Sequence, residues 1–387
     1  MIYFDNGATT FPKPKGVIIA VNKVLQKYGA NPGRSGHDLS LKSAEIMYDC
    51  RKSLADFFHI SSPENVIFTN NCTCAINTVI KGTLKSGDHA VISSLEHNAV
   101  VRPLEELKKK DISYSIAECV PYDDEATIDN FRNAMNENTR LVICTHASNV
   151  FGIKLPVERI GALCRLHGVL FCVDAAQTAG VAEISLDDTS IDYLCMSGHK
   201  GLYGPMGTGV LIINSDIHPE SLIEGGTGSL SYQKQQPDIL PDMYESGTPN
   251  LPGIAGLNEG IKFIKSCGIE KIEGHEMRLA QLLYDNLKNM KDIELYTKRP
   301  NSGISVPVIS FNVKGQDSED ISSELNNFGI AVRAGLHCAP LAHESFNTID
   351  RGTVRAVLSA FNTDSDVRFF VSAINKIIRL KKRIQKG

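Results

Sequence analysis

The chain has 387 residues, of which 42% are hydrophobic and 22% charged, and its formal net charge at pH 7 is −4. This length predicts two domains in one subunit, and the near-balanced charge argues against nucleic acid or an anionic membrane as a partner. No apolar run approaches the roughly 18 residues of a membrane-spanning helix. Residues 1–5 have the pattern of a strand with no basic signal segment before it, so we expect a cytoplasmic protein.

Between residues 64 and 214, short apolar segments alternate with amphipathic segments of helical spacing. The expected strands are 66–69, 90–93, 141–145, 169–173, 193–197 and 210–213, and the expected helices pass through 75–80, 100–110 and 157–166. Continuous apolar strands separated by helices are typical of a mainly parallel sheet that is covered on both faces. We therefore predict a large α/β domain over residues 15–250.

The pattern changes after the Gly/Pro-rich stretch 247–253. The next expected elements are a long helix over 269–290 and strands at 306–313, 330–333 and 353–359. A last helix is expected to open at Thr363, with Asp366 as its acidic capping partner. These elements predict a smaller α+β domain formed by residues 1–14 and 251–387.

The ten cysteines are scattered along the chain, and several, such as Cys144, lie within apolar strand-like runs. A small secreted scaffold would cluster its cysteines between turns, and a structural zinc site would need Cys or His ligands paired at short spacing. Neither pattern is present, so most of these thiols are expected to be buried small hydrophobes, and no metal site is predicted.

Two residues at strand ends suggest a cofactor that carries an aldehyde. Lys200 follows the strand 193–197 in the segment Ser197-Gly198-His199-Lys200, and a lysine on a rigid, glycine-flanked edge can lose its proton and form an imine. Asp174 ends the strand 169–173, where a buried carboxylate needs a cationic partner such as a protonated pyridine nitrogen. Each residue alone has a plainer explanation: a surface lysine, and an aspartate that caps a loop.

Further polar residues follow the neighbouring strands. Thr73 opens a helix, where free backbone N–H groups and a hydroxyl would form a phosphate cradle, although a simple N-cap explains Thr73 equally well. His97 offers a flat ring for stacking on a pyridine, and Gln177 offers a donor for a phenolic oxygen; Ser197 and His199 add further donors. Because all these groups lie at strand or loop ends of one α/β domain, we expect them to share one ligand site.

In this order the residues resemble the class V aminotransferase family, specifically the cysteine desulfurases of the SufS, CsdA and NifS type, which include selenocysteine lyases. The resemblance extends from the segment Tyr3-Phe4-Asp5-Asn6-Gly7-Ala8-Thr9-Thr10 to Arg355-Ala356. It implies the type I fold of pyridoxal-phosphate-dependent transferases, in which the large domain has a mainly parallel sheet of the seven-stranded type. It also implies pyridoxal 5'-phosphate as cofactor and a homodimer as the assembly.

The resemblance further implies a role for each matched residue. Lys200 is the implied Schiff-base lysine, Asp174 the partner of the pyridinium nitrogen and His97 the stacking histidine. The other implied cofactor contacts are Thr73, Cys74, Asn149, Gln177, Ser197, His199 and, from the neighbouring subunit, Thr248. The implied substrate contacts are Ala8, Asn149, Arg333 and Arg355. Arg355 would clamp the substrate carboxylate, a task that suits a bidentate guanidinium.

The segment Arg333-Ala334-Gly335-Leu336-His337-Cys338-Ala339 resembles the desulfurase loop whose cysteine attacks the sulfur of the substrate. A loop gives a thiolate the reach that this step needs, and the neighbouring Arg333 and His337 are expected to lower the pKa of the thiol. The implied reaction converts L-cysteine to L-alanine and leaves a persulfide on Cys338. A sulfur acceptor protein then takes the sulfur, as in iron–sulfur cluster assembly. A packed structural cysteine is the alternative, which a loop containing Gly, His and Pro disfavours.

Other functions stay open at this point. Cys74 stands where the family usually has a glutamate, and Leu336 stands where a His or Thr is common. The alternatives are lysis of L-selenocysteine, another class V reaction such as transamination or β-elimination, and a scaffold role without cofactor. Cys338 argues against most of the other class V reactions, and the intact Lys200, Asp174 and Arg355 argue against the scaffold.

Overall fold

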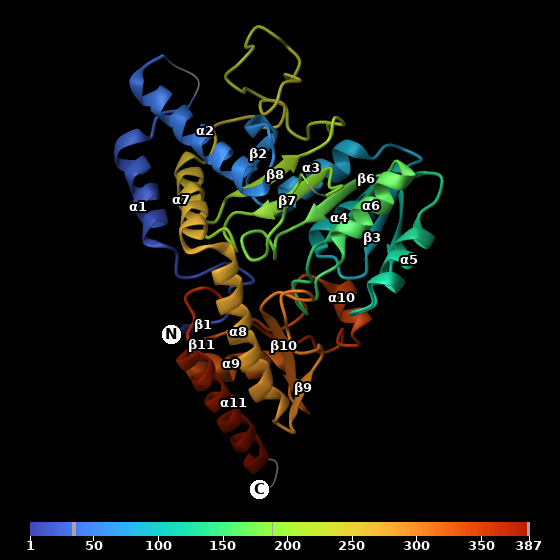
Figure 1. The fold of residues 1–387 in the computed structure, drawn as a ribbon, viewed down its shortest axis with the longest axis vertical. Coiled ribbons are helices and arrows are strands. Elements are labelled where there is room, and N and C mark those ends of the chain that lie inside the picture. Colours follow the sequence, from blue (N-terminus) through green and yellow to red (C-terminus); the bar gives the residue numbers. More distant parts are fainter. Residues whose placement is uncertain (33–35, 188, 385–387) are drawn as a thin grey trace.

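The structure, a computed structural model, describes residues 1–32, 36–187 and 189–384 (Figure 1). Its main sheet has seven strands in the order β2-β8-β7-β6-β5-β3-β4. These strands are β2 (Val66–Thr69), β3 (His89–Ser93), β4 (Ser113–Ala117), β5 (Thr139–Thr145), β6 (Leu170–Asp174), β7 (Tyr193–Ser197) and β8 (Gly209–Ile213). Only β8 runs antiparallel to its neighbours in the sheet, β2 and β7, and the other pairs are parallel. The predicted mainly parallel sheet is therefore confirmed.

The main sheet is covered on both faces because its strands bury every position. Along β6, for example, Phe171 and Val173 belong to one hydrophobic cluster and Leu170 and Cys172 to another, as alternation across a strand requires. The covering helices are α2 (Asp38–Phe58), α3 (Cys72–Thr83), α4 (Asn98–Leu107), α5 (Asp124–Ala134), α6 (Val157–His167) and α7 (Leu251–Cys267), and α1 (Lys15–Lys23) packs on α7. Helices α3 and α4 pack on one face, and α2, α5, α6 and α7 pack on the other.

The expected elements of this region are found to within a few residues, and the elements that were not expected include the helix α5 and the edge strand β4. That strand lies at the edge of the sheet, where Ser113 and Ile116 are exposed, so the segment Ser113–Ala117 lacks the continuous apolar run of the inner strands. The helix expected over 100–110 begins earlier and ends at Leu107, after which residues 108–110 form a 3₁₀ turn.

A second, three-stranded antiparallel sheet has the order β12-β10-β9. The strands are β9 (Ile293–Leu295), β10 (Val308–Val313) and β12 (Val354–Val357), and the helices around them are α8 (Ile269–Lys288), α9 (Ser318–Asn327) and α11 (Asp364–Ile384). A short helix, α10 (Pro340–Ser345), follows the predicted nucleophile loop. In Figure 1 this smaller layer lies below the main sheet.

The N-terminal segment joins the smaller layer. Strand β1 (Ile2–Tyr3) pairs in parallel with β11 (Ile330–Ala331), and Phe4 lies in the same hydrophobic cluster as β10 and α11. Helix α7, in contrast, adds Leu257 and Ile261 to the core of the main sheet. The division into domains at residue 250 stays a prediction.

The helix α11 begins with the capping contacts that the sequence predicts. The Thr363 N–H donates to Asp366 Oδ2 over 2.8 Å, and the Asp366 N–H donates to Thr363 Oγ1 over 3.2 Å. This reciprocal pair is the capping box predicted from the sequence.

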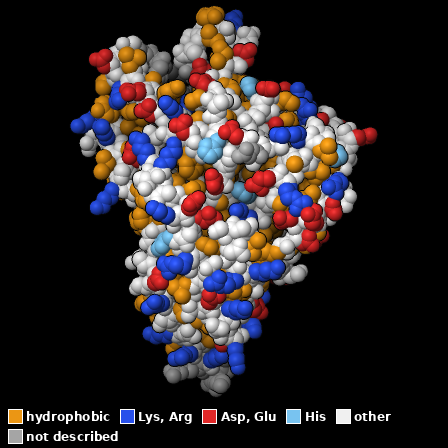
Figure 2. Space-filling view, in the orientation of Figure 1, with side chains coloured by type: hydrophobic (Ala, Val, Ile, Leu, Met, Phe, Trp, Pro, Cys, Tyr) orange, Lys and Arg blue, Asp and Glu red, His pale blue; other side chains and the backbone are white. Residues whose placement is uncertain are grey.

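The surface in view carries no large field of one sign. Figure 2 shows acidic and basic side chains interspersed over this face of the molecule, in keeping with the small net charge. Within the part of the chain that the structure describes, no helix is long and apolar enough to cross a membrane.

Candidate active site

A cavity of about 150 Å³ opens at the carboxyl ends of β5, β6 and β7, beside the first turns of α3 and α4. Its lining residues are Asn71, Cys72, Thr73, His97, Ala99, Thr145, Asn149, Asp174, Ala176, Gln177, Ser197, His199 and Lys200. The structure thus brings together eight residues predicted from the sequence: Thr73, His97, Asn149, Asp174, Gln177, Ser197, His199 and Lys200. They meet because the ends of parallel strands share one edge of a sheet.

Lys200 lies in a tight segment after β7. The Lys200 carbonyl accepts hydrogen bonds from Thr10 Oγ1 over 2.8 Å and from the Tyr203 N–H over 2.9 Å. The Lys13 ammonium donates to the neighbouring His199 carbonyl over 2.8 Å. Burial lowers the pKa of the Lys200 amine, and the charge of Asp174 partly opposes this shift. A lysine in this state can supply the neutral amine that attacks a carbonyl.

Asp174 is buried at the end of β6, with 4% of its surface exposed. Its Oδ1 accepts hydrogen bonds from the Ala176 N–H over 2.9 Å and from Cys72 Sγ over 3.4 Å. Burial raises the pKa of the Cys72 thiol well above its ordinary value, so this thiol keeps its proton and acts as a donor. The sequence analysis did not identify Cys72 as a site residue. The only feature of the sequence that pointed to Cys72 was its position next to Thr73.

The first turns of α3 and α4 place two more side chains at the cavity. Asn71 caps α3, because its Oδ1 accepts the Cys74 N–H over 2.9 Å. Thr73 is therefore not the N-cap, and its exposed side chain lines the cavity instead. His97 caps α4 and accepts the Ala99 N–H at Nδ1 over 3.0 Å, so the neutral ring carries its proton on Nε2. Burial lowers the pKa of His97, which favours that neutral ring.

His199 has an unused nitrogen beside Lys200. Its Nδ1 is buried and has no hydrogen-bond partner among the residues that the structure describes. Burial and the positive charges of Lys200 and Lys13 lower the pKa of His199 to about 4, so the ring is neutral at physiological pH. A buried, unpaired nitrogen of this kind is costly unless a ligand supplies the missing partner.

A guanidinium approaches the cavity from the smaller layer. Arg355 on β12 is 1% exposed, and its Nη1 donates to the Asn149 carbonyl over 2.8 Å while its Nη2 donates to Asp5 Oδ1 over 3.1 Å. Its Nε is buried without a partner. Gly7 packs closely against this group, since a Cβ there would lie 3.1 Å from the Arg355 Cζ atom.

Two further predicted substrate residues flank Arg355 without lining the cavity. The Ala8 N–H donates to the Asp5 carbonyl over 3.0 Å, which places Ala8 in the turn that also carries Gly7. Arg333 is exposed and exchanges backbone hydrogen bonds with Arg355. Asn149 lines the cavity and contacts Arg355, so it connects Arg355 and the residues beside it to the cavity.

Cys338 is exposed, and the backbone around it is hydrogen-bonded to residues beside the cavity. The Asn98 N–H donates to the Cys338 carbonyl over 2.7 Å, and Asn149 Nδ2 donates to the His337 carbonyl over 2.8 Å. The expectation that His337 lowers the thiol pKa by its charge is wrong. The His337 ring is buried, its Nε2 donates to the Thr353 carbonyl over 3.0 Å, and burial lowers its pKa to about 2, so the ring is neutral.

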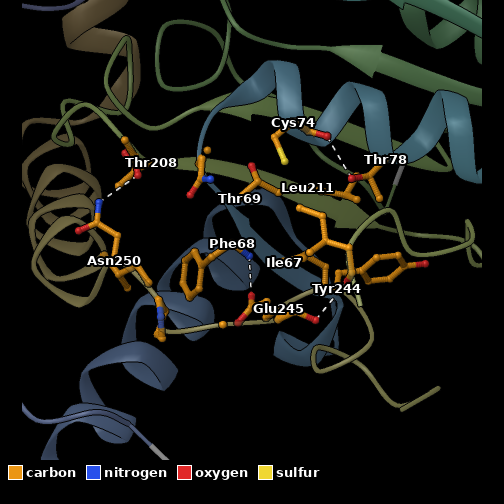
Figure 3. A pocket seen from close by; sticks show the side chains of 18 of the residues that line it. Ile67, Phe68, Thr69, Cys74, Thr78, Thr208, Leu211, Tyr244, Glu245 and Asn250 are labelled. Carbon is orange, nitrogen blue, oxygen red and sulfur yellow. Dashed lines mark hydrogen bonds between the residues drawn. The ribbon is translucent and has the colours of Figure 1, made fainter. Parts of the chain in front are cut away.

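The structure places Cys74 and Thr248 at a second cavity of about 140 Å³, shown in Figure 3. This cavity lies between β2, α3 and the segment 244–250. Glu245 holds that segment in place, because its Oε1 accepts the Phe68 N–H over 2.6 Å and its Oε2 pairs with Arg51. Thr248 is exposed, and Cys74 does not reach the Lys200 cavity within this subunit, because its side chain lines the opposite side of α3.

Comparison with known proteins places this arrangement in a family. A family model described as "Aminotransferase class-V" matches residues 2–370. The chain belongs to the class-V aminotransferase family. It is 35% identical to a "Probable cysteine desulfurase" of Pyrococcus abyssi, over 98% of this chain and 94% of that protein. It is 32% identical to a "Cysteine desulfurase" of Salmonella agona, again over 98% of this chain and 94% of the relative.

A solved structure gives the same assignment. The apo structure of the cysteine desulfurase from Thermococcus onnurineus superposes with a TM-score of 0.89 at 32% sequence identity, covering 98% of this chain and 94% of that one. The resemblance found in the sequence and the predicted type I fold are therefore confirmed. The chain is an enzyme of this class-V family, whose members depend on pyridoxal phosphate.

Proposed function

We propose that this protein is a cysteine desulfurase that converts L-cysteine to L-alanine and holds the released sulfur as a persulfide on Cys338. The observation that carries this proposal is the attachment of the Cys338 backbone to the rim of the Lys200 cavity through Asn98 and Asn149. An exposed thiol is thereby tied to the rim of the cavity that contains Lys200, whose pKa is lowered by burial.

The cavity fits pyridoxal phosphate. The unpartnered Nδ1 of His199, with the side chains of Thr73 and Ser197, supplies donors for a phosphate group. Asp174 would hold the pyridine N–H, His97 and Gln177 would contact the ring, and Lys200 would bind the aldehyde carbon. When bound, the cofactor supplies an electron sink for the carbon that carries the amino group.

The protein's own residues then bind and orient the substrate. The buried Nε of Arg355 has no partner in the structure, so the guanidinium has a donor left for the substrate carboxylate. Cys338 takes the sulfur as a bond forms between its Sγ and the substrate sulfur and the substrate's carbon–sulfur bond breaks. His97 Nε2–H and Lys200 Nζ are the groups placed to move protons at the reacting carbon.

The assembly and the acceptor extend the same proposal. Thr248 is exposed on a segment fixed by Glu245, which suits a contact to the phosphate of a neighbouring subunit in a homodimer. A sulfur acceptor protein would take the persulfide sulfur from Cys338, whose side chain is exposed. The proposed domains are residues 15–250 and the combination of 1–14 with 251–387.

The direct test is turnover of L-cysteine by the purified protein with added pyridoxal phosphate and dithiothreitol, measured as sulfide and alanine in equal amounts. Cys338→Ala should abolish sulfide release and keep the visible absorbance of the bound cofactor. Unchanged sulfide release by Cys338→Ala would refute the persulfide step. A wild-type protein that stays colourless with the cofactor would refute the assignment of the cavity, and L-selenocysteine turnover alone would favour a selenocysteine lyase.

A further inference from the structure

Cys338 lies in a turn whose backbone conformation is unfavourable for its residues. The Ala339 N–H donates to the Leu336 carbonyl over 2.9 Å, and the two central residues, His337 and Cys338, have φ of 50° and 59°. Positive φ at both central positions is the type I′ arrangement, which favours glycine and asparagine. For His and Cys this conformation costs about 1–2 kcal/mol per residue, so contacts around the turn must hold it.

Two of those contacts come from the main sheet's side of the site. The carbonyls of His337 and Cys338 accept hydrogen bonds from Asn149 Nδ2 and the Asn98 N–H. They fix the backbone from outside the turn. They do not act on the His337 side chain, which points inward and is 5% exposed.

On its inward side the His337 ring donates from Nε2 to the Thr353 carbonyl over 3.0 Å, and it also packs against a second buried histidine. The ring of His343 on α10 stacks beside that of His337, with centroids 5.8 Å apart and planes 24° apart. His343 is fully buried, and its Nδ1 is hydrogen-bonded to Thr348 Oγ1 over 2.7 Å. On another side, the Phe151 ring lies 5.7 Å from His343 between centroids. Thr348 therefore fixes the rotation of the ring against which His337 packs.

We propose that His343 and Thr348 are positioning residues for the sulfur-transfer step, because they hold the inward ring of His337 and so keep Cys338 in its turn above the cavity. This inference rests on the proposed role of Cys338 as nucleophile. Neither residue lines the Lys200 cavity, and neither contacts Arg355 or Asp174 in the described part of the chain.

The consequence is a separation of kinetic effects. Loosening the turn spreads Cys338 over several orientations, of which only some place Sγ against the substrate sulfur, so the rate of persulfide formation falls. Binding of the substrate carboxylate at Arg355 and of the cofactor at Lys200 is unaffected, because those groups are held by other elements. We therefore expect kcat to fall while KM and cofactor content stay the same.

The test uses a pair of substitutions at Thr348 in the holoenzyme. Thr348→Val keeps the shape and removes the hydroxyl, whereas Thr348→Ser keeps the hydroxyl. Persulfide formation on Cys338 in a single turnover is expected to be about tenfold slower in Thr348→Val and within about twofold of wild type in Thr348→Ser. His343→Phe, which keeps a buried ring without its nitrogens, should resemble Thr348→Val.

The matched control is Thr127→Val. Thr127 on α5 is as buried as Thr348, at 1% exposure for each, and its Oγ1 accepts the Val120 N–H over 3.0 Å, so its hydroxyl bonds outside the segment 336–348. This variant should lose stability without slowing persulfide formation. Equal slowing in both valine variants, or a rise in KM with kcat unchanged, would overturn the positioning role.

Hydrogen exchange separates this inference from the proposed function. In Thr348→Val, the peptide spanning residues 335–342 should exchange about tenfold faster than in wild type, because the Ala339 amide loses its stable turn. Exchange that is unchanged overturns the inference even if the enzyme releases sulfide. If the peptide 335–342 exchanges faster in Thr348→Val but the wild-type protein releases no sulfide from cysteine, His343 and Thr348 do hold the turn. Only the desulfurase assignment is then refuted.

Discussion

The Lys200 cavity and the Cys338 turn are the two halves of the proposed site, and they are built differently. The cavity's charged groups stand at the ends of β6 and β7, inner strands whose neighbours on both sides fix their backbone. The turn has only the short strand β11 before it and the short helix α10 after it, so its geometry depends on side chains such as His337 and Asn149. Groups that hold a cofactor thus come from the sheet, whereas the nucleophile comes from a turn fixed by tertiary contacts.

The largest expected effect comes from breaking the cavity while leaving the turn intact. Lys200→Arg keeps the positive charge but lacks an amine that can form an imine, so turnover should fall by about 10³-fold or more. The visible absorbance of the bound cofactor should also disappear. Exchange of the peptide 335–342 should match wild type, and turnover within tenfold of wild type would contradict the role of Lys200.

The second largest effect on activity is expected at Arg355, where the two halves of the site meet. Arg355→Lys cannot reproduce the forked contacts to Asn149 and Asp5 while also binding a carboxylate, so kcat/KM for L-cysteine should fall by about 10²-fold, mainly through KM. The control is Arg278→Lys, because Arg278 pairs with Asp364 on the surface. A loss that falls on kcat with KM unchanged would assign Arg355 to the chemical step and not to substrate binding.

One buried histidine from each half gives a prediction for acid pH. Burial lowers the pKa of His146, behind the cavity, to about 3 and that of His337, in the turn, to about 2. In the unfolded chain both titrate near 6.5. As the pH falls below about 6.5 the unfolded state gains protons that the folded state does not, so each histidine reduces the free energy of unfolding by about 1.4 kcal/mol per pH unit.

The measurement is the difference between variant and wild type in urea unfolding from pH 7.5 to 5. The difference is needed because burial raises the pKa of Glu96 and of Glu276 to about 8, and such carboxyls gain protons in the folded state first and oppose the trend. His146→Gln should therefore lose less stability than wild type on acidification. Parallel profiles would show that His146 takes up its proton equally in the folded and unfolded states, which would contradict the lowered pKa.

The same contrast explains what the sequence could predict. Lys200 and Asp174 were found because a strand end is a local signal, and the order of parallel strands then brings such ends together. The charge of His337 was misjudged because burial of a ring in a loop is decided by distant residues such as Thr353. His343 and Thr348 carried no local signal, since their contact with the turn exists only after α10 folds against it.

The same limit applies to the residues at the start of α3. Thr73 and Asn71 are both good caps in sequence, and only the geometry shows that Asn71 takes this role and leaves Thr73 facing the cavity. Cys74 follows Thr73 directly, yet the helical rotation of α3 turns its side chain to the cavity of Figure 3. Adjacent residues on a helix do not share a face, so a motif match alone did not place Cys74.

The smallest expected effect concerns Cys72, the one thiol that donates to the cavity's buried carboxylate. Its S–H is a weak donor to Asp174, and the Ala176 N–H already binds the same oxygen, so the loss of the thiol should cost little. Cys72→Ala should weaken cofactor binding by about two- to fivefold, which corresponds to the net value of one weak hydrogen bond. Cys72→Ser supplies a stronger donor of similar size and should bind the cofactor at least as tightly as wild type. Equal weakening in both variants would mean that Cys72 acts through packing in the core of the main sheet and not through its hydrogen bond. In that case the difference between the cavity and the Cys338 turn would be larger still, because no side-chain donor beside the strand end would contribute to holding Asp174.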